Sequence, residues 1–385
     1  MLRVFTAFSG YDSQCMALDR IGIDYDLIGW SEIDKFAIRA HDAVYPQYAD
    51  RNLGNVAEID PNALPDFDLM TYSSPCQDFS IAGRQRGGEK GSGTRSSLLW
   101  YCEEIIRVKR PRFLVMENVK NLVSEKFRPL FLEWERTLSG MGYTNFTEVL
   151  NAKDYGVPQN RERVFCVSVL DGWYGFPHRE VLRKCLRDVL EEEVAEKYFL
   201  SEKLVAGFMK HNEKHLAKGT GFIFRPKQPA DCANALRAVQ ALAATDNVVI
   251  YQRSRGFNKG GIHKIAPAVS SNSYERNNVV LQAGVTKESK HNSMSYRVYD
   301  SSGVCPTLDT CKGGSHTPKI LGEDYLLRRL TPRECFRLMG VSEQDIDAIQ
   351  AAGISNSQQY KMAGNSIVVD VLAKIFQQIF RFNRI

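Results

Sequence analysis

The stretch RVFTAFSGYDSQCMALDRIGIDYDLIGWSEIDKFAIRAHDAV, residues 3–44, decides the fold class. Two short apolar runs, Arg3–Phe8 and Tyr25–Trp30, have the length and composition of strands. Each is followed by a run with helical spacing of apolar residues, Ser13–Ile21 and then Lys35–Val44. This βαβα order predicts an α/β protein with a doubly wound, parallel sheet, whose ligand site lies at the carboxyl ends of the strands.

The same alternation of strand and helix patterns continues to about residue 170. Beyond it the sequence has other patterns. Further strands are predicted at 67–72, 112–117, 146–151 and 164–170, and helices at 96–108 and 128–141. The predicted domains are one α/β domain over 1–180, a helical linker region over 181–218, a smaller irregular β-rich domain over 219–325, and a C-terminal segment, 326–385, that returns to the first domain.

Composition excludes several classes of protein. The chain has 385 residues, of which 43% are hydrophobic and 25% charged, as in ordinary soluble globular proteins of two or three domains. No apolar run is long enough to cross a bilayer, and we expect no membrane association and a cytoplasmic location. Nine scattered cysteines without a C-x-x-C pair indicate neither a disulfide framework nor a zinc site.

Positive charge is concentrated in one part of the chain. Residues 247–320 contain ten Lys or Arg and four Asp or Glu, whereas the net charge of the whole chain is +5. The remainder is therefore close to neutral. Such a segment is typical of a surface that binds a polyanion, and equally of a solvated, loop-rich surface.

Two turns suggest a nucleotide-like ligand. The first predicted strand ends in Phe8-Ser9-Gly10-Tyr11, where a glycine turn before a helix lets backbone amides approach a ligand. The second ends at Trp30-Ser31-Glu32, where a carboxylate can accept hydrogen bonds from a ribose diol. Together they indicate a cofactor that contains adenosine.

Reactive side chains follow three further strands. Cys76 lies among polar turn residues directly after the strand at 67–72, Glu117 ends the next strand, and Arg161 and Arg163 precede a third. A cysteine flanked by turn residues is placed to be exposed and reactive, unlike a core cysteine. In an extended chain, alternate residues place both arginines on one face.

This set of motifs resembles the DNA (cytosine-5) methyltransferases that use S-adenosylmethionine. The matching motifs occur in the family order and span nearly the whole chain: Phe-x-Gly at 8–10, Pro-Cys-Gln at 75–77, Glu-Asn-Val at 117–119, Gln-x-Arg-x-Arg at 159–163, Arg297 through Pro306-Thr307 to Gly314, and Gly364-Asn365-Ser366. The resemblance implies a Rossmann-like methyltransferase domain with the β-rich region as its target-recognition domain.

The resemblance also implies the catalytic roles. Cys76 is the nucleophile that adds to carbon 6 of cytosine, which turns the ring into an enamine able to take a methyl group at carbon 5. Glu117 in its protonated form hydrogen-bonds the ring N3 and the exocyclic amine. Arg163, with Arg161 beside it, neutralises charge at O2 and positions Glu117.

Further residues are expected to bind the cofactor. By resemblance these are Phe8, Ser9, Gly10, Tyr11, Glu32, Ile33, Asn55, Val56, Pro75, Leu98, Asn365, Ser366 and Ile367. Two positions depart from the family pattern. Asp12 stands where a second glycine is expected, and Asn55 stands where an aspartate is expected at the adenine amine. An amide oxygen can still accept that hydrogen bond, which predicts weakened or altered affinity and not loss of binding.

The expected partner is double-stranded DNA, with the target cytosine flipped out of the helix. Candidate DNA contacts are Gln77, Ser80, Arg84, Arg86, Arg95, Arg253, Arg255, Lys259 and Arg276. We expect a monomer that associates with the nucleoid through DNA. The sequence leaves open whether a restriction endonuclease accompanies it. It also leaves open two alternatives: an RNA methyltransferase on the same fold, and a catalytically silent DNA-binding homologue, which Asp12 and Asn55 favour.

Overall fold

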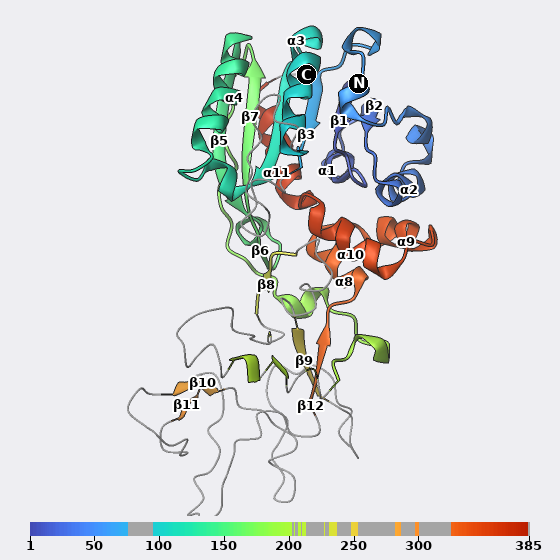
Figure 1. Ribbon diagram of the computed structural model, residues 1–385, viewed down its shortest axis with the longest axis vertical. Coiled ribbons are helices and arrows are strands. Elements are labelled where there is room, and N and C mark those ends of the chain that lie inside the picture. Colours follow the sequence, from blue (N-terminus) through green and yellow to red (C-terminus); the bar gives the residue numbers. More distant parts are fainter. Residues whose placement is uncertain are drawn as a thin grey trace, which may run out of the picture. The chain divides into compact units, whose positions relative to one another are not determined.

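The computed structural model describes residues 1–75, 95–201, 204, 207, 208, 210–212, 227, 231–236, 248–252, 282–285, 297–299 and 325–383. Its central feature is a six-stranded sheet in the order β2-β1-β3-β4-β7-β5 (Figure 1). The strands are β1 (Leu2–Ala7), β2 (Tyr25–Ser31), β3 (Leu69–Tyr72), β4 (Phe113–Val119), β5 (Tyr143–Asn151) and β7 (Glu162–Leu170). This confirms the predicted α/β class.

The sheet is mixed, so the prediction of a wholly parallel sheet is wrong in one part. Strands β1, β2, β3 and β4 are parallel, but β7 runs antiparallel to both β4 and β5. The reason is the short connection from Asn151 to Glu162, because a parallel crossover needs a dozen or more residues and usually a helix. As a result, the start of β7 lies at the same edge as the carboxyl ends of the parallel strands.

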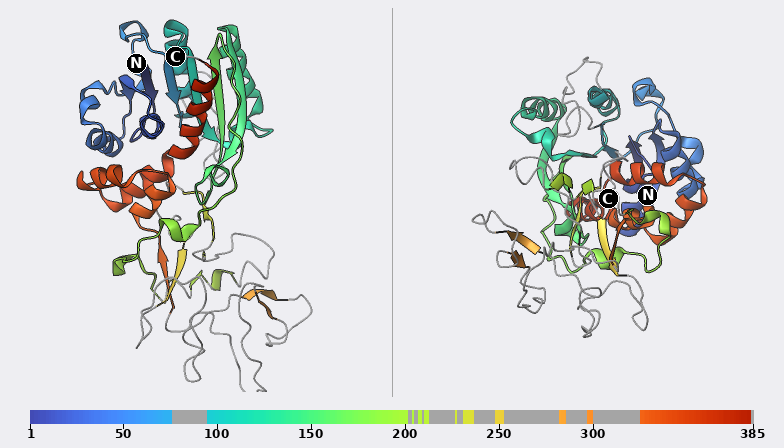
Figure 2. Two further views of the ribbon diagram at one scale, coloured as in Figure 1. Left: turned by 180° about the vertical axis from the view of Figure 1, so that it is seen from behind. Right: turned by 60° about the horizontal axis from the view of Figure 1, so that its bottom comes forward.

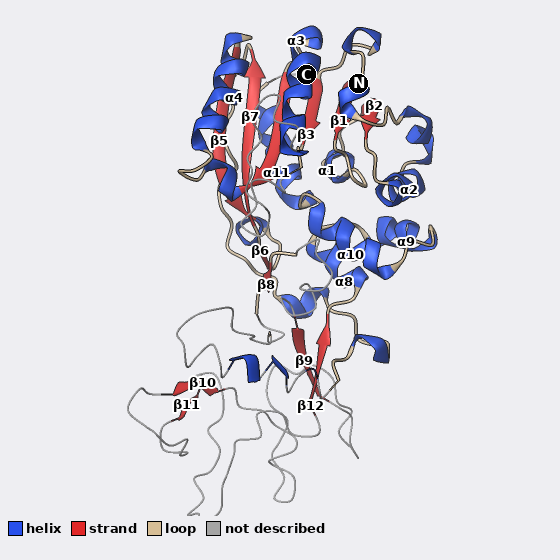
Figure 3. Ribbon diagram, viewed as in Figure 1, coloured by secondary structure: helices blue, strands red, loops and turns tan. Residues whose placement is uncertain are grey.

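Helices cover both faces of the sheet (Figure 3). Among the described residues the α-helices include α1 (Ser13–Arg20), α2 (Lys35–Val44), α3 (Leu99–Lys109), α4 (Arg128–Gly140), α8 (Pro332–Leu338), α9 (Glu343–Ala351), α10 (Asn356–Asn365) and α11 (Val369–Phe382). In Figure 1, α8, α9 and α10 lie below the sheet and not on its faces. Figure 2 shows α11 on the opposite face from α3 and α4. All four residues of β3 and six of the seven in β4 are buried, as expected for strands covered on both sides.

Aromatic packing holds α3 and α4 against the sheet. Trp134 of α4 packs edge-on against Trp100 of α3, with ring centroids 5.5 Å apart. Its indole Nε1 donates to the hydroxyl of Tyr72 at the end of β3, at 3.3 Å. This contact satisfies the polar atoms of two buried aromatic residues and fixes the end of the strand that leads toward Cys76.

Of the C-terminal segment, residues 331–385 belong to the same unit as the sheet. It begins with a reciprocal capping box, in which Thr331 and Glu334 hydrogen-bond each other's backbone at the start of α8. It ends with α11, which packs on α1, and Arg20 of α1 is ion-paired with Asp370 of α11 at 2.8 Å.

The chain divides into two compact units. The first comprises residues 1–190, 231–246 and 331–385, and the second 191–230 and 247–330. The described parts of the second unit include two antiparallel pairs, β9 (Val248–Gln252) with β12 (Tyr325–Arg329), and β10 (Gln282–Val285) with β11 (Arg297–Tyr299).

The structure of residues 181–201 differs from the helices that the sequence pattern predicts there. The structure forms two short 3-10 helices there, Leu186–Val189 and Glu196–Tyr198, in place of an α-helix. Cys185 and Asp188 cap the first of them, which favours a local turn over a continuous helix. Among the described residues no helix is long and apolar enough to span a membrane.

Candidate active site

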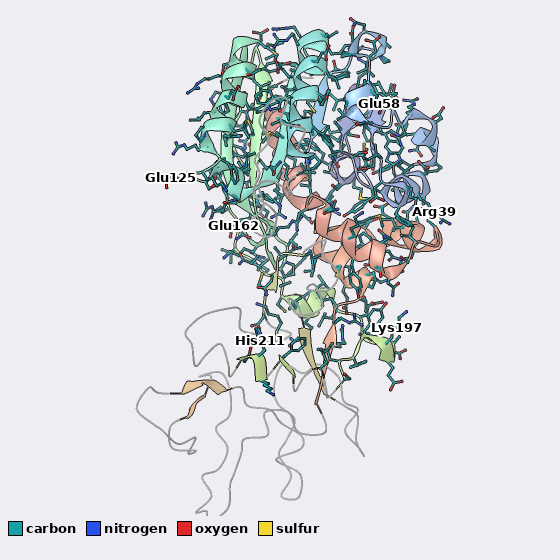
Figure 4. The ribbon with its side chains drawn as sticks, viewed as in Figure 1. Arg39, Glu58, Glu125, Glu162, Lys197 and His211 are labelled. Carbon is teal, nitrogen blue, oxygen red and sulfur yellow. The ribbon has the colours of Figure 1, made fainter. Side chains whose placement is uncertain are left out.

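A carboxyl and a guanidinium meet at the carboxyl edge of the sheet. Glu117 lies near the end of β4, and its Oε1 is 3.1 Å from Nε of Arg163 at the start of β7. The register explains the contact: Val119 lies opposite Arg163, and Glu117, two residues earlier, shares the same face. Figure 4 marks this end of β7 by the neighbouring side chain of Glu162.

The environment of Glu117 favours its protonated form. Its side chain is 8% exposed, and burial raises the pKa of its carboxyl above the usual value. The positive charges of Arg163 and Arg161 and the Ser73 hydroxyl pull the pKa partly back. Glu117 is therefore a carboxyl that keeps its proton to higher pH than a solvated glutamate, beside a fixed cation.

The chain that leads to Cys76 is tied to β4. Asn118, next to Glu117, is buried and donates from Nδ2 to the backbone oxygen of Ser74 at 3.1 Å and to its hydroxyl at 3.3 Å. This places Ser73-Ser74-Pro75 beside the Glu117 edge, and Pro75 directly precedes Cys76 in the sequence. Asn118 belongs to the Glu-Asn-Val motif, but neither it nor Ser74 was assigned a role from the sequence.

Several candidates lie outside the described residues. They are Cys76, Gln77, Ser80, Arg84, Arg86, Arg253, Arg255, Lys259 and Arg276. Arg95 starts a 3-10 helix, Arg95–Leu98, before α3, but its side chain is not among those described. The predicted DNA contacts therefore stay predictions.

Arg161 is engaged differently from Arg163. Its buried guanidinium donates to three backbone oxygens: Leu236 at 2.9 Å, Gly364 at 2.9 Å and Ser366 at 2.7 Å. Arg161 and Arg163 line one small cavity, but the contacts of Arg161 assign it to holding backbone segments together. The expected direct role of Arg161 in charge neutralisation stays a prediction.

The cause of this difference is a change of strand partner. The short strand β6 (Gln159–Asn160) pairs with β8 (Ala233–Asn234), whereas β7 pairs with β4 and β5. Arg161 lies between β6 and β7 and lines one small cavity with Arg163 and Phe165, so these alternate residues share a face. Gln159 acts in the same way as Arg161. Its Nε2 donates to the backbone oxygen of Leu338 at 2.7 Å, and its Oε1 accepts from the amide of Leu236 at 3.1 Å.

The predicted nucleotide turns come together through Glu32. Its Oε2 accepts from the amide of Gly10 at 3.0 Å, and its Oε1 accepts from the amides of Ile33 and Asp34, both at 2.8 Å. Ile33 beside it is 70% exposed, a large apolar side chain facing solvent. The carboxylate is thus held rigidly between the ends of β1 and β2, next to an apolar surface.

The turn after β1 has an unusual backbone. Phe8, Gly10 and Asp12 have positive φ values of 56°, 61° and 63°. Only glycine adopts this region freely, which explains the glycine at position 10. Ser9 is buried, and Tyr11 is also buried with its ring edge-on against Phe336, so that Tyr11 could offer a ligand its backbone but not its ring.

Asn55 and Val56 have local structural roles. Asn55 caps the 3-10 helix Val56–Glu58, accepting from the amide of Ala57 at 3.2 Å and donating to Glu58 at 3.0 Å. Val56 is buried in the main hydrophobic cluster, and Leu98 packs against that cluster before α3.

The C-terminal motif joins the turn after β1. Asn365 is exposed at the end of α10, Ser366 donates from its hydroxyl to that of Ser13 at 3.1 Å, and Ile367 is buried. Because Arg161 binds the backbone of Ser366, one short segment connects the start of α1 with the edge that carries Glu117.

The family model for C-5 cytosine-specific DNA methylase matches residues 2–381. The chain belongs to the C-5 cytosine-specific DNA methylases. It is 32% identical to type II methyltransferase M2.ScrFI of Lactococcus lactis subsp. cremoris, over 99% of each chain. It is also 32% identical to orphan methyltransferase M.SPRI of Bacillus phage SPR, over 98% of this methylase and 97% of the relative.

The fold of this methylase has solved counterparts. The Dnmt2 methyltransferase of S. pombe superposes with a TM-score of 0.64 at 18% identity and covers 99% of each chain. At that identity the similarity establishes the fold. The family and its named relatives make this chain a DNA methyltransferase, an enzyme of methyl transfer to cytosine.

Proposed function

We propose that this enzyme transfers a methyl group from S-adenosylmethionine to carbon 5 of a cytosine flipped out of duplex DNA, with Cys76 as the nucleophile. The observation that carries the proposal is the Glu117–Arg163 pair, 3.1 Å apart at the sheet edge to which Asn118 ties the segment preceding Cys76. Glu117 supplies an acid and Arg163 a cation, and the chain segment beside them continues directly into Cys76, which supplies the thiol.

The chemistry needs each of these groups. Carbon 5 of cytosine is a weak nucleophile, and attack of the Cys76 thiolate at carbon 6 makes it an enamine carbon. The attack places negative charge on the ring, which Glu117 offsets by donating its proton toward N3 while Arg163 faces O2. S-adenosylmethionine supplies an electrophilic methyl group on sulfur. Loss of the carbon 5 proton to water or hydroxide then expels the thiolate and restores the ring.

The turn around Gly10 and Glu32 fits an adenosyl group. A carboxylate has about four acceptor sites, and three backbone amides already bind Glu32, so about one site remains for a ribose hydroxyl. The exposed side chain of Ile33 offers an apolar surface for the adenine. Asn55 keeps its side-chain oxygen toward its own helix cap, which supports altered contacts at the adenine edge.

The remaining roles follow from the two-unit organisation. The second unit carries the segment with the basic excess, and we assign it target recognition in the duplex. Arg161 is a positioning residue, because its guanidinium holds the backbone of Gly364 and Ser366, whereas Arg163 makes the ion pair with Glu117. We propose a monomer, since one chain carries all the groups.

The test uses purified protein, radiolabelled S-adenosylmethionine and unmethylated duplex DNA. We expect methyl transfer by the wild type, none by Cys76→Ala, and full transfer by Cys185→Ala, which removes a half-buried cysteine elsewhere. DNA carrying 5-fluorocytosine should give a covalent adduct, because fluorine cannot leave carbon 5 as the proton does. Transfer by Cys76→Ala would refute the mechanism. Transfer to RNA but not DNA would move the assignment to RNA.

A further inference from the structure

We propose that Asp12 is a positioning residue that fixes the cofactor turn, defined as residues 8–11, in its binding geometry. This rests on the proposed use of S-adenosylmethionine. Asp12 departs from the family pattern at the position of a second glycine, which would suggest a weakened site. The structure indicates the opposite, because the side chain of Asp12 hydrogen-bonds to β1 and α1 and packs beside His41 of α2.

The anchoring contacts all involve the buried carboxylate of Asp12. Its Oδ1 accepts from the amide of Cys15 at 3.2 Å and so caps α1. Its Oδ2 accepts from the hydroxyl of Thr6 on β1 at 2.9 Å. The same oxygen lies 3.7 Å from Nε2 of His41 on α2, and the His41 ring stacks on Trp30 of β2 at 3.7 Å between centroids.

The backbone of Asp12 closes the turn itself. Its amide donates to the backbone oxygen of Ser9 at 2.9 Å, and its φ of 63° continues the alternation of left-handed residues that begins at Phe8. This path points the amide of Gly10 at Glu32, the group proposed to hold the ribose. Asp12 is 0% exposed, so it acts on a ligand through this turn and not by contact.

Glycine at position 12 would reach the same φ without strain but would leave the turn unanchored. Aspartate and asparagine tolerate the left-handed region better than other residues with a side chain. With asparagine, the side-chain oxygen can still accept from Cys15 or Thr6. A turn held in advance in its bound form loses less freedom when the cofactor binds, which favours affinity.

The experiment measures binding of S-adenosylmethionine and of S-adenosylhomocysteine to the full chain by calorimetry. We expect Asp12→Gly to weaken binding about tenfold and Asp12→Asn less than about threefold, because glycine loses both side-chain hydrogen bonds and asparagine can keep one. Thr6→Val, which removes one anchor with little change of shape, should weaken binding about threefold. The kcat at saturating cofactor should stay near the wild-type value while KM for the cofactor rises.

Asp19→Asn is the matched control. Asp19 lies on the same helix and accepts from the Tyr45 hydroxyl at 2.8 Å, away from the turn. Equal weakening by Asp19→Asn, or unchanged affinity in Asp12→Gly and Thr6→Val, would overturn the proposal. If Asp12→Gly does not fold, Thr6→Val decides in the same way. Absence of cofactor binding by the wild type would instead remove the proposed function and this inference with it.

Discussion

Replacing each arginine of the Gln-x-Arg-x-Arg motif by methionine should have different effects: Arg161→Met should lower stability, and Arg163→Met should lower activity. Arg161 donates to the backbone oxygens of Leu236, Gly364 and Ser366, all from a buried guanidinium. Its removal leaves these acceptors without their charged donor. A hydrogen bond to a charged group contributes about 1.5–3 kcal/mol, and bonds in one network do not add fully, so a loss of about 3–5 kcal/mol in the free energy of unfolding is expected for Arg161→Met.

Arg163→Met should cost little stability and most of the activity. Its partner Glu117 can take up a proton when the cation is gone, which avoids an unpaired buried charge and limits the loss to about 1 kcal/mol. The cation is nevertheless needed where negative charge develops on the ring. Removing one such group lowers kcat by about 100-fold or more.

Urea unfolding followed by tryptophan fluorescence distinguishes the two variants. All four tryptophans lie in the first unit, which contains both arginines, so the signal reports on that unit. With a urea m-value of about 3 kcal/mol/M, Arg161→Met should lower the midpoint by about 1 M or more. A wild-type midpoint for Arg161→Met, or equal losses of stability in both variants, would refute the assignment of a backbone-holding role to Arg161.

Three further predictions concern buried or ligand-facing carboxyls. Burial raises the pKa of Asp12 to about 6, so near pH 5 the native state holds a proton that the unfolded state releases. The free energy of unfolding of the wild type, relative to that of Asp12→Asn, should therefore fall by about 1 kcal/mol from pH 5 to pH 7. The comparison is made between the two proteins because burial lowers the pKa of His41 to about 4, which acts in the opposite direction. Since protonated Glu117 is the proposed donor, single-turnover transfer should decline as pH rises through its raised pKa, and Arg163→Met, which removes a cation that lowers this pKa, should move the decline to higher pH. Glu32→Gln should weaken S-adenosylmethionine binding about tenfold in calorimetry with kcat nearly unchanged, because one charged acceptor is lost.

The sequence predicted those parts of the site that depend on the ends of strands. Gly10 and Glu32 follow two neighbouring parallel strands, so the strand pattern alone brings these two residues together. Glu117 ends a buried apolar strand of the same sheet, which puts it at the same edge. Their contacts with other segments are set by tertiary packing. The hydrogen bond from Asn118 to Ser74 joins residues 44 positions apart, which no local pattern contains.

Three features differ from a simple interpretation of the sequence pattern: the direction of β7, the contacts of Arg161 and the role of Asp12. The antiparallel direction of β7 follows from the short chain between Asn151 and Glu162, which is too short for a parallel crossover. Alternation put Arg161 and Arg163 on one face, but the partners of Arg161 come from segments distant in the sequence, which no local pattern contains. Asp12 looked like a defect in a glycine pattern because its capping of α1 and its bond to Thr6 appear only in three dimensions.

Base-resolution mapping of 5-methylcytosine tests the central claim most directly. The protein is expressed in a host without cytosine methylation, with Cys76→Ala as the matched control. The account predicts methylated cytosines confined to one short DNA sequence in cells with the wild type and none in cells with Cys76→Ala. An unmethylated genome despite soluble, folded wild-type protein, or equal methylation by Cys76→Ala, would contradict it.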